Sequence, residues 1–64
     1  MSSDYQALEL VQKEIGKMRQ DREVFINSGC AKDFAEYQHV CGVILGLTHA
    51  DIIIKDLVQR MEND

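Results

Sequence analysis

Proline is absent from this sequence, and cysteine occurs only twice in 64 residues. Without proline, no position forbids a helix in the interior of any segment. Two cysteines cannot form the several disulfides that hold many small secreted domains together. If Cys41 lies in a helix, its separation of eleven residues from Cys30 puts the two Cα atoms beyond the roughly 7 Å limit for a disulfide. We therefore expect two free thiols in a reducing compartment.

The chain also lacks an excess of positive charge and a long apolar run. It has 11 acidic and 7 basic side chains, a net charge of −4, so we expect no direct binding to nucleic acid. The longest apolar stretch, from Val40 to Ile54, has fifteen residues and includes His49 and Asp51, whereas a membrane span needs about twenty. The N-terminal residues show no signal-peptide pattern. These absences predict a cytoplasmic protein with no membrane partner.

The length sets a further limit on stability. We expect residues 1–64 to form one domain, and a chain of this size buries only about 60 % of the surface that its unfolded form exposes. Such a core rarely supplies more than roughly 3–5 kcal/mol, so chains of this size usually depend on disulfides, a metal or partner subunits. Because a disulfide framework is excluded, we expect self-association or a partner protein.

Two long segments have helical periodicity. The first, at about residues 4–27, repeats at alternating steps of three and four residues, which is typical of a helix seam. Its apolar members, which we expect in the core, are Leu8, Val11, Ile15, Met18 and Phe25. Arg22 occupies another seam position. It either reaches water along its alkyl stem or forms an ion pair with Asp33, Glu36 or a partner subunit.

A short connection separates the two segments. Asn27-Ser28-Gly29 ends the first helix, with Gly29 suited to the left-handed conformation that follows a last helical turn. Asp33 and Glu36 form the capping pattern of a second helix, at about residues 33–62, although Ser28 is an alternative start. A link this short makes the helices antiparallel neighbours. The sequence therefore predicts an all-α, antiparallel two-helix hairpin.

The second segment is more apolar than one partner helix can cover. The stripe that we expect in the core consists of Val40, Val43, Leu47, Ile54, Leu57 and Met61, together with Ala50. Further apolar residues lie around the helix from this stripe, and Gly42 and Gly46 form a GxxxG pair that favours a close helix crossing. We therefore predict that hairpins assemble into a bundle or ring. The predicted protein interface consists of Gly42, Leu45, Gly46, Ile52 and Ile53.

The residues that could support chemistry are poorly spaced for it. His39, Cys41 and His49 do not have the paired spacing of a structural zinc site, so we expect no metal and no other cofactor. A Cys–His nucleophilic pair would lack an orienting group and an oxyanion pocket. Asp51 with Lys55, and Asp56 with Arg60, have the spacing of ion pairs on a solvated helix face. We therefore predict that the protein is not an enzyme and has no catalytic residues.

Two stretches of the sequence show a resemblance. Residues 28–47, SGCAKDFAEYQHVCGVILGL, and residues 54–64, IKDLVQRMEND, resemble short, mostly uncharacterised helical proteins encoded by tailed bacteriophages. In that group a similar turn leads into a helix with a Cys/Thr-Gly-Val-Ile/Leu-x-Gly-Leu core, here Cys41 to Leu47. Leu45 departs from the pattern, which has a polar residue at this position. The resemblance implies a virion component or assembly factor.

These observations predict a non-enzymatic structural or assembly protein of a phage virion, which self-associates and docks through its second helix. Its expected partners are a second copy of itself and phage structural proteins, and its expected location is the host cytoplasm or the virion. The alternative is a small phage-encoded inhibitor that binds and blocks a host protein, since acidic helical proteins can occupy sites meant for nucleic acid. Recovery of one stoichiometric host protein from a lysate would favour the inhibitor.

Overall fold

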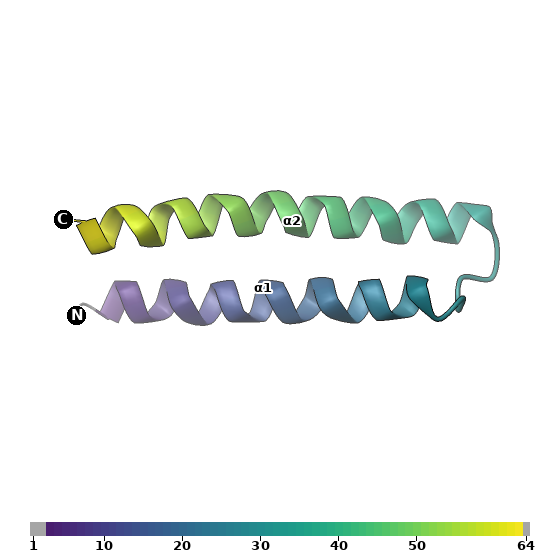
Figure 1. Cartoon of the computed structure of the whole chain (residues 1–64), viewed down its shortest axis with the longest axis horizontal. Coiled ribbons are helices and arrows are strands. Elements are labelled where there is room, and N and C mark those ends of the chain that lie inside the picture. Colours follow the sequence, from purple (N-terminus) through teal and green to yellow (C-terminus); the bar gives the residue numbers. More distant parts are fainter. Residues whose placement is uncertain (1–2, 64) are drawn as a thin grey trace.

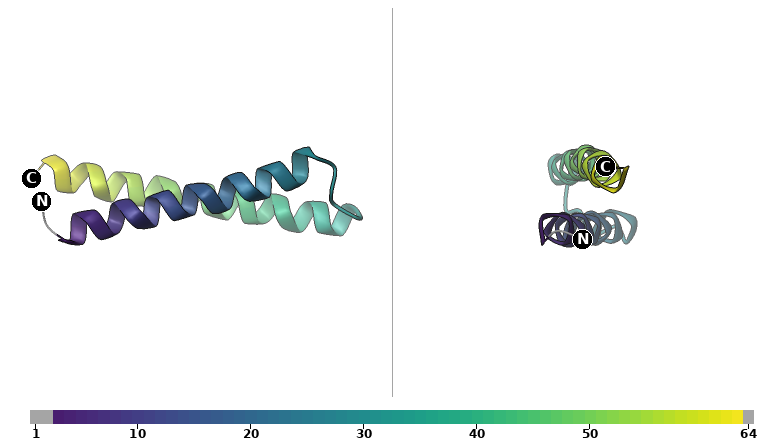
Figure 2. Two further views of the ribbon diagram at one scale, coloured as in Figure 1. Left: turned by 90° about the horizontal axis from the view of Figure 1, so that it is seen from below. Right: turned by 90° about the vertical axis from the view of Figure 1, so that its left-hand side faces the viewer.

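The computed structural model describes residues 3–63 and contains two α-helices over this range. Helix α1 spans Ser3–Asn27 and helix α2 spans Phe34–Asn63. They run antiparallel side by side, with the connection at one end and both termini at the other (Figure 1). The hairpin measures 47 × 14 × 13 Å, and its helices cross at a shallow angle (Figure 2). The predicted all-α hairpin is confirmed, and each helix boundary lies within one residue of the predicted one.

The connection has the geometry that its sequence predicts. Gly29 has φ +73°, and the N–H groups of Gly29 and Cys30 donate to the carbonyls of Ile26 and Phe25 at 3.1 and 3.3 Å. This pair of bonds satisfies carbonyls at the end of α1 and requires a left-handed residue at position 29. At the start of α2, the N–H of Glu36 donates to the carboxylate of Asp33 at 2.8 Å. The predicted end of α1 at Gly29 and the predicted cap of α2 at Asp33 are both confirmed.

The seam between the helices differs from the predicted one. The residues of α1 that are buried or half-buried at alternating steps of three and four are Tyr5, Leu8, Gln12, Ile15 and Arg19, and Ile26 continues the series beyond the exposed Arg22. The corresponding residues of α2 are Val40, Ile44, Leu47, Asp51, Ile54, Val58 and Met61. Of the predicted seam positions, α1 keeps Leu8 and Ile15, and Arg22 is exposed, whereas α2 keeps Val40, Leu47, Ile54 and Met61. At the other positions the contact has moved by one residue, from Val11 to Gln12, for example, and from Leu57 to Val58.

Three residues that were predicted in the core are exposed in the single chain: Val11 is 45 % exposed, Met18 55 % and Leu57 38 %. Of the other predicted core residues, Val40 is buried, while Leu8, Ile15, Phe25, Val43, Leu47, Ile54 and Met61 are half-buried. The error has a physical reason. A contact between two helices covers only two positions in every seven residues. One of these is filled by Gln12 and Arg19 on α1 and by Val58 on α2, so Val11, Met18 and Leu57 lie beside the contact.

The hairpin has a thin core. Among residues 3–63, no side chain has an exposed fraction below 2 %, and the buried residues are Tyr5, Val40, Val58 and the charged Asp51. The predicted close crossing at the GxxxG pair is also absent within the chain. A Cβ atom added to Gly42 or Gly46 would meet no heavy atom within 4 Å, so α1 does not approach these glycines. Both glycines lie on the exposed side of α2.

Candidate protein-interaction surface

A row of exposed apolar residues runs along the outside of α2. Leu45, Ile52 and Ile53 are 57 %, 60 % and 61 % exposed, and the open glycines 42 and 46 lie in the same stretch of the helix. We call the residues Gly42, Leu45, Gly46, Ile52 and Ile53 the outer row. All five were predicted as interface residues, and all five are accessible to a partner. Their role as an interface stays a prediction.

A second apolar surface lies along one flank of the hairpin, where α1 and α2 meet. Met18 and Val43 line a hollow of about 280 Å³ together with Asp21, Arg22 and Leu47. Residues seven positions apart share a side of a helix, so Val11 extends this surface along α1, and Ala50 and Leu57 extend it along α2. We call Val11, Met18, Val43, Ala50 and Leu57 the apolar flank. All five residues were predicted in the core or its stripe, but the hairpin leaves them half-buried or exposed.

Arg22 borders this hollow and is exposed. Among residues 3–63 it forms no ion pair with Asp33 or Glu36, the two partners within the chain that were considered for it. Glu36 instead lies 4.0 Å from Lys32. The proposed pairing of Arg22 with a partner subunit stays a prediction.

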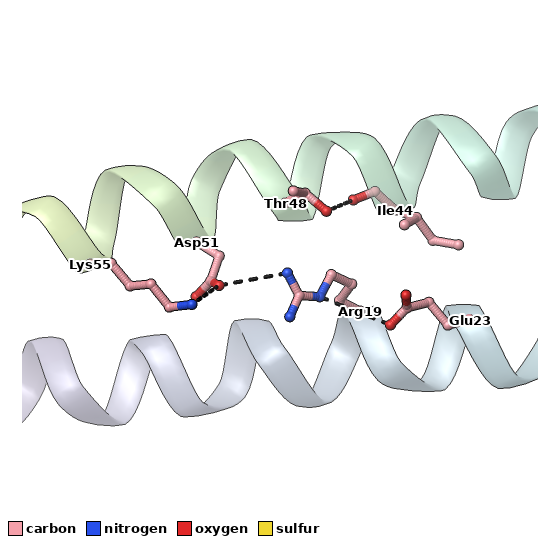
Figure 3. A network of polar contacts seen from close by, with 6 residues as sticks. All are labelled: Arg19, Glu23, Ile44, Thr48, Asp51 and Lys55. Atoms are coloured by element: carbon pink, nitrogen blue, oxygen red, sulfur yellow. Dashed lines mark hydrogen bonds and ion pairs between the residues drawn. The ribbon is translucent and has the colours of Figure 1, made fainter.

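A cluster of charged side chains lies between the helices (Figure 3). The carboxylate of Asp51 is 3.6 Å from the guanidinium of Arg19 on α1 and 3.2 Å from the ammonium of Lys55, one turn further along α2. Arg19 is also 4.0 Å from Glu23. The sequence predicted the Asp51–Lys55 pair but placed it on a solvated face. That placement was wrong, because only 4 % of Asp51 is exposed.

The sequence contained a signal for this position that periodicity alone could not resolve. Asp51 follows Leu47 by four residues and precedes Ile54 by three, so it continues a seam through Ile44 and Val58. An apolar alternative, Ala50, is adjacent, and a simple search for apolar repeats prefers it. The charged seam residue is stabilised by Arg19, which lies 32 residues away in the sequence. A local pattern cannot reveal such a contact.

A second polar contact joins the two free ends of the hairpin. The phenol of Tyr5 donates a hydrogen bond to the carboxylate of Glu62. This bond, with burial and the nearby charges, raises the pKa of Tyr5 to about 12 from the usual 10. The sequence gave no indication of this contact, because Tyr5 and Glu62 are 57 residues apart. It fixes the pairing of the helices at the end opposite the turn.

We expect this contact to give the fold a characteristic dependence on alkaline pH. Because the folded chain holds the Tyr5 proton more tightly than the unfolded chain, the contact stabilises fully below pH 10 and is lost as the pH rises from 10 to about 12. Tyr5→Phe should remove this part of the pH dependence of unfolding. In a titration of tyrosinate absorbance it should also remove the step near pH 12, whereas Tyr37→Phe should retain that step. A Tyr5 that titrates near pH 10 would contradict the contact.

The residues considered for chemistry are not brought together. Cys30 and Cys41 are free thiols, exposed and half-buried respectively, and the Cys30 sulfur lies 3.0 Å from the hydroxyl of Ser28. His39 and His49 are exposed on α2. Within the described range 3–63, no three His, Cys, Asp or Glu side chains are grouped so that they could hold a metal ion. Asp56 pairs with Arg60 on the surface, as predicted, with the Arg60 Nε at 3.0 Å.

The sequence interpretation overlooked an aromatic pair beside the turn. Phe34 and Tyr37 lie at the start of α2 with their rings stacked at 6.3 Å, and both side chains are exposed. A hydrogen bond with the Cys41 sulfur raises the pKa of Tyr37. The signal in the sequence was the spacing of three residues, which brings two side chains together on one side of a helix.

The fold and these surfaces define the chain as a small all-helical hairpin with exposed apolar faces. Comparison with models of protein families, with curated proteins and with solved structures finds no match. Over residues 3–63, neither helix is long and apolar enough to cross a membrane.

Proposed function

We propose that this chain is a non-enzymatic structural or assembly protein that self-associates and binds a larger protein through the outer row of α2. One observation carries the proposal. Leu45, Ile52 and Ile53 are more than half exposed, and the hairpin does not use them for its own packing. Scattered apolar residues on a surface are normal, whereas several large ones on one side of an element mark an interaction site. Leu45 and Ile52 are seven residues apart and share a side of α2.

The glycines of the outer row support the same proposal. Gly42 and Gly46 each cost roughly 1 kcal/mol of helix propensity relative to alanine. Within the chain nothing approaches them, so the hairpin gains no packing in return. Small residues at a spacing of four allow the backbone of another helix to approach closely. A partner helix laid along the outer row would use this space and cover the adjacent aliphatic side chains.

The resemblance of residues 28–47 and 54–64 to short phage proteins supports a phage structural protein as the partner. On this proposal the chain acts in the host cytoplasm during assembly or remains in the virion. Leu45, the residue that departs from the phage pattern, is 57 % exposed and adds an apolar contact to the docking surface. The alternative, an inhibitor of a host protein, would use the same surface on a different partner.

Replacing Leu45 and Ile52 together by glutamate should abolish docking and leave the hairpin folded. Burial of the two aliphatic side chains contributes about 2–4 kcal/mol, so affinity should fall by about thirtyfold or more. The measurement is recovery of partners by tagged chain from phage-infected cells, identified by mass spectrometry, with circular dichroism as the test of folding. A matched control is the double replacement of Leu10 and Val24 on α1 by glutamate, since these residues are 64 % and 60 % exposed.

We expect the unmodified chain and the α1 control to recover a capsid, neck or tail protein, and the Leu45/Ile52 variant to recover none. A variant that still recovers the same partner would contradict the role of the outer row. Recovery of one stoichiometric host protein in place of a phage protein would contradict the structural role and support the inhibitor.

A further inference from the structure

The apolar flank is a surface that neither the packing of the hairpin nor the outer row explains. It consists of Val11, Met18, Val43, Ala50 and Leu57, and its hollow of about 280 Å³ lies between the helices on one side. The outer-row residues Leu45 and Ile52 lie two residues after Val43 and Ala50, which places them well around α2 from the flank, at about 200°. The chain therefore has two apolar surfaces, which adjoin at Gly46 and Ile53 and are distinct at Leu45 and Ile52.

The sequence of each helix is patterned for a four-helix bundle. Two apolar positions in every seven residues suffice for a pair of helices, whereas helices in a bundle carry a third one beside them. On α2 the flank supplies this third position, and on α1 it supplies the second apolar position of each repeat, because polar residues occupy part of the seam. The hairpin seam contains Gln12, Arg19 and Asp51, while Val11, Met18 and Ala50 lie beside them on the flank. A hairpin that acted alone would be more stable with Val11, Met18 and Ala50 in the seam between its helices.

The exposed area fits the addition of one further copy. The chain exposes 4896 Å². A compact monomer of 7.3 kDa is expected to expose about 4,200 Å², so the hairpin exposes about 700 Å² more. Each partner in an interface of standard size contributes roughly 800 Å². The excess surface of the hairpin is therefore close to what one side of a stable dimer buries.

The charges beside the flank determine how a second copy would lie. Three residues after each flank position comes a rim residue, and the rim of α1 carries Glu14 and Asp21. The rim of α2 carries Gly46, Ile53 and Arg60, with no acidic residue among them. If the two turns lie at the same end, each α1 faces the partner's α2, and the acidic rim faces a neutral and basic one. If the turns lie at opposite ends, the two acidic rims face each other and repel.

We propose that the apolar flank binds the apolar flank of a second copy of this chain, forming a four-helix bundle with both turns at the same end. The inference rests on the proposed function in one respect, the self-association of the chain. It assigns self-association to the flank and leaves Leu45 and Ile52 free for a different protein. In the bundle, an apolar side chain of each copy enters the hollow between Met18 and Val43 of the other.

The first test is the solution mass from sedimentation velocity over a concentration series. The unmodified chain should have twice the 7.3 kDa mass of one chain. Met18→Glu should weaken the dimer by about a hundredfold or more, since the symmetry buries two carboxylates in the apolar interface. Leu10→Glu is the matched control, because Leu10 is 64 % exposed and Met18 55 % on the same helix. Leu10→Glu should remain a dimer. A monomeric unmodified chain would overturn the proposal.

The second test does not depend on whether Met18→Glu folds. Cys30 lies in the turn and is exposed, so a spin label on Cys30 in a Cys41→Ala chain reports the distance between the two turns. Turns at the same end should give an intermolecular distance below about 30 Å, given the width of a bundle. Turns at opposite ends of a hairpin 47 Å long would give a much longer distance. The short distance supports the proposed bundle, and the long one overturns it.

The Leu45/Ile52 double glutamate variant separates this inference from the proposed function. It should remain a dimer and should lose only the docking partner. If it becomes monomeric while Met18→Glu remains a dimer, self-association uses the outer row and the assignment to the flank is wrong. If both the unmodified chain and this variant are dimers with the short Cys30 distance, but neither recovers a partner, the docking function fails and the bundle stands.

Discussion

Replacing Arg19 by alanine is expected to lower the free energy of unfolding by about 2 kcal/mol, because the carboxylate of Asp51 would then remain buried with one cation fewer. Asp51 is 4 % exposed, and its two cations are Arg19 at 3.6 Å and Lys55 at 3.2 Å. Lys55 limits the loss, since it keeps one charge beside the carboxylate. Arg22→Ala is the matched control on the same helix. Arg22 is exposed, so its replacement should change the stability by less than about 0.5 kcal/mol.

The two partners of this ion pair are expected to respond unequally. Asp51→Ala should cost less than Arg19→Ala, because the cations of Arg19 and Lys55 can turn to water, whereas the carboxylate cannot. The double replacement of Arg19 by methionine and Asp51 by leucine should match or exceed the stability of the unmodified chain, since well-packed apolar residues often replace a buried ion pair without loss. Urea unfolding at one fixed protein concentration measures all four variants, because self-association makes stability depend on concentration.

A double variant as unstable as Arg19→Ala would contradict this account. It would mean that the space around Asp51 cannot accept apolar side chains. The surrounding seam residues, Leu47 and Ile54 among them, are aliphatic and half-buried, which favours acceptance.

Two glycine replacements are expected to change stability in opposite directions. Gly29→Ala should destabilise by about 1–2 kcal/mol, because Gly29 has φ +73° and an L-residue is strained there. Gly42→Ala should stabilise the free chain by roughly 0.5–1 kcal/mol, because Gly42 lies inside α2 and an added Cβ meets nothing within 4 Å. Each replacement is the control for the other, since both add the same methyl group.

The measurement is again urea unfolding, with helix content followed by circular dichroism. A Gly29→Ala variant of unchanged stability would contradict the left-handed turn. A Gly42→Ala variant that loses stability would mean that another helix already covers Gly42 in the folded assembly. In that case docking or self-association would use the outer row even without the proposed partner.

The sequence by itself determined the two helices, their ends and their antiparallel course. These features depend on short-range chemistry: the absence of proline, the left-handed Gly29, the Asp33 cap and a connection too short for any other arrangement. The outer row was also recognisable, because Leu45 and Ile52 lie far around the helix from both the predicted and the observed seam. For these features, residues close in the sequence contain all the necessary information.

Only the tertiary structure decided which seam the helices use. On α2 the predicted and observed seams share Val40, Leu47, Ile54 and Met61, and they differ by one residue at every position between these. Local periodicity favours the predicted seam, because Val11, Met18 and Ala50 are apolar where the observed seam has Gln12, Arg19 and Asp51. The choice follows from contacts between residues distant in the sequence, Arg19 with Asp51 and Tyr5 with Glu62. Those contacts bring a carboxylate into the seam and leave Val11 and Met18 on the flank, where the single chain has nothing to cover them.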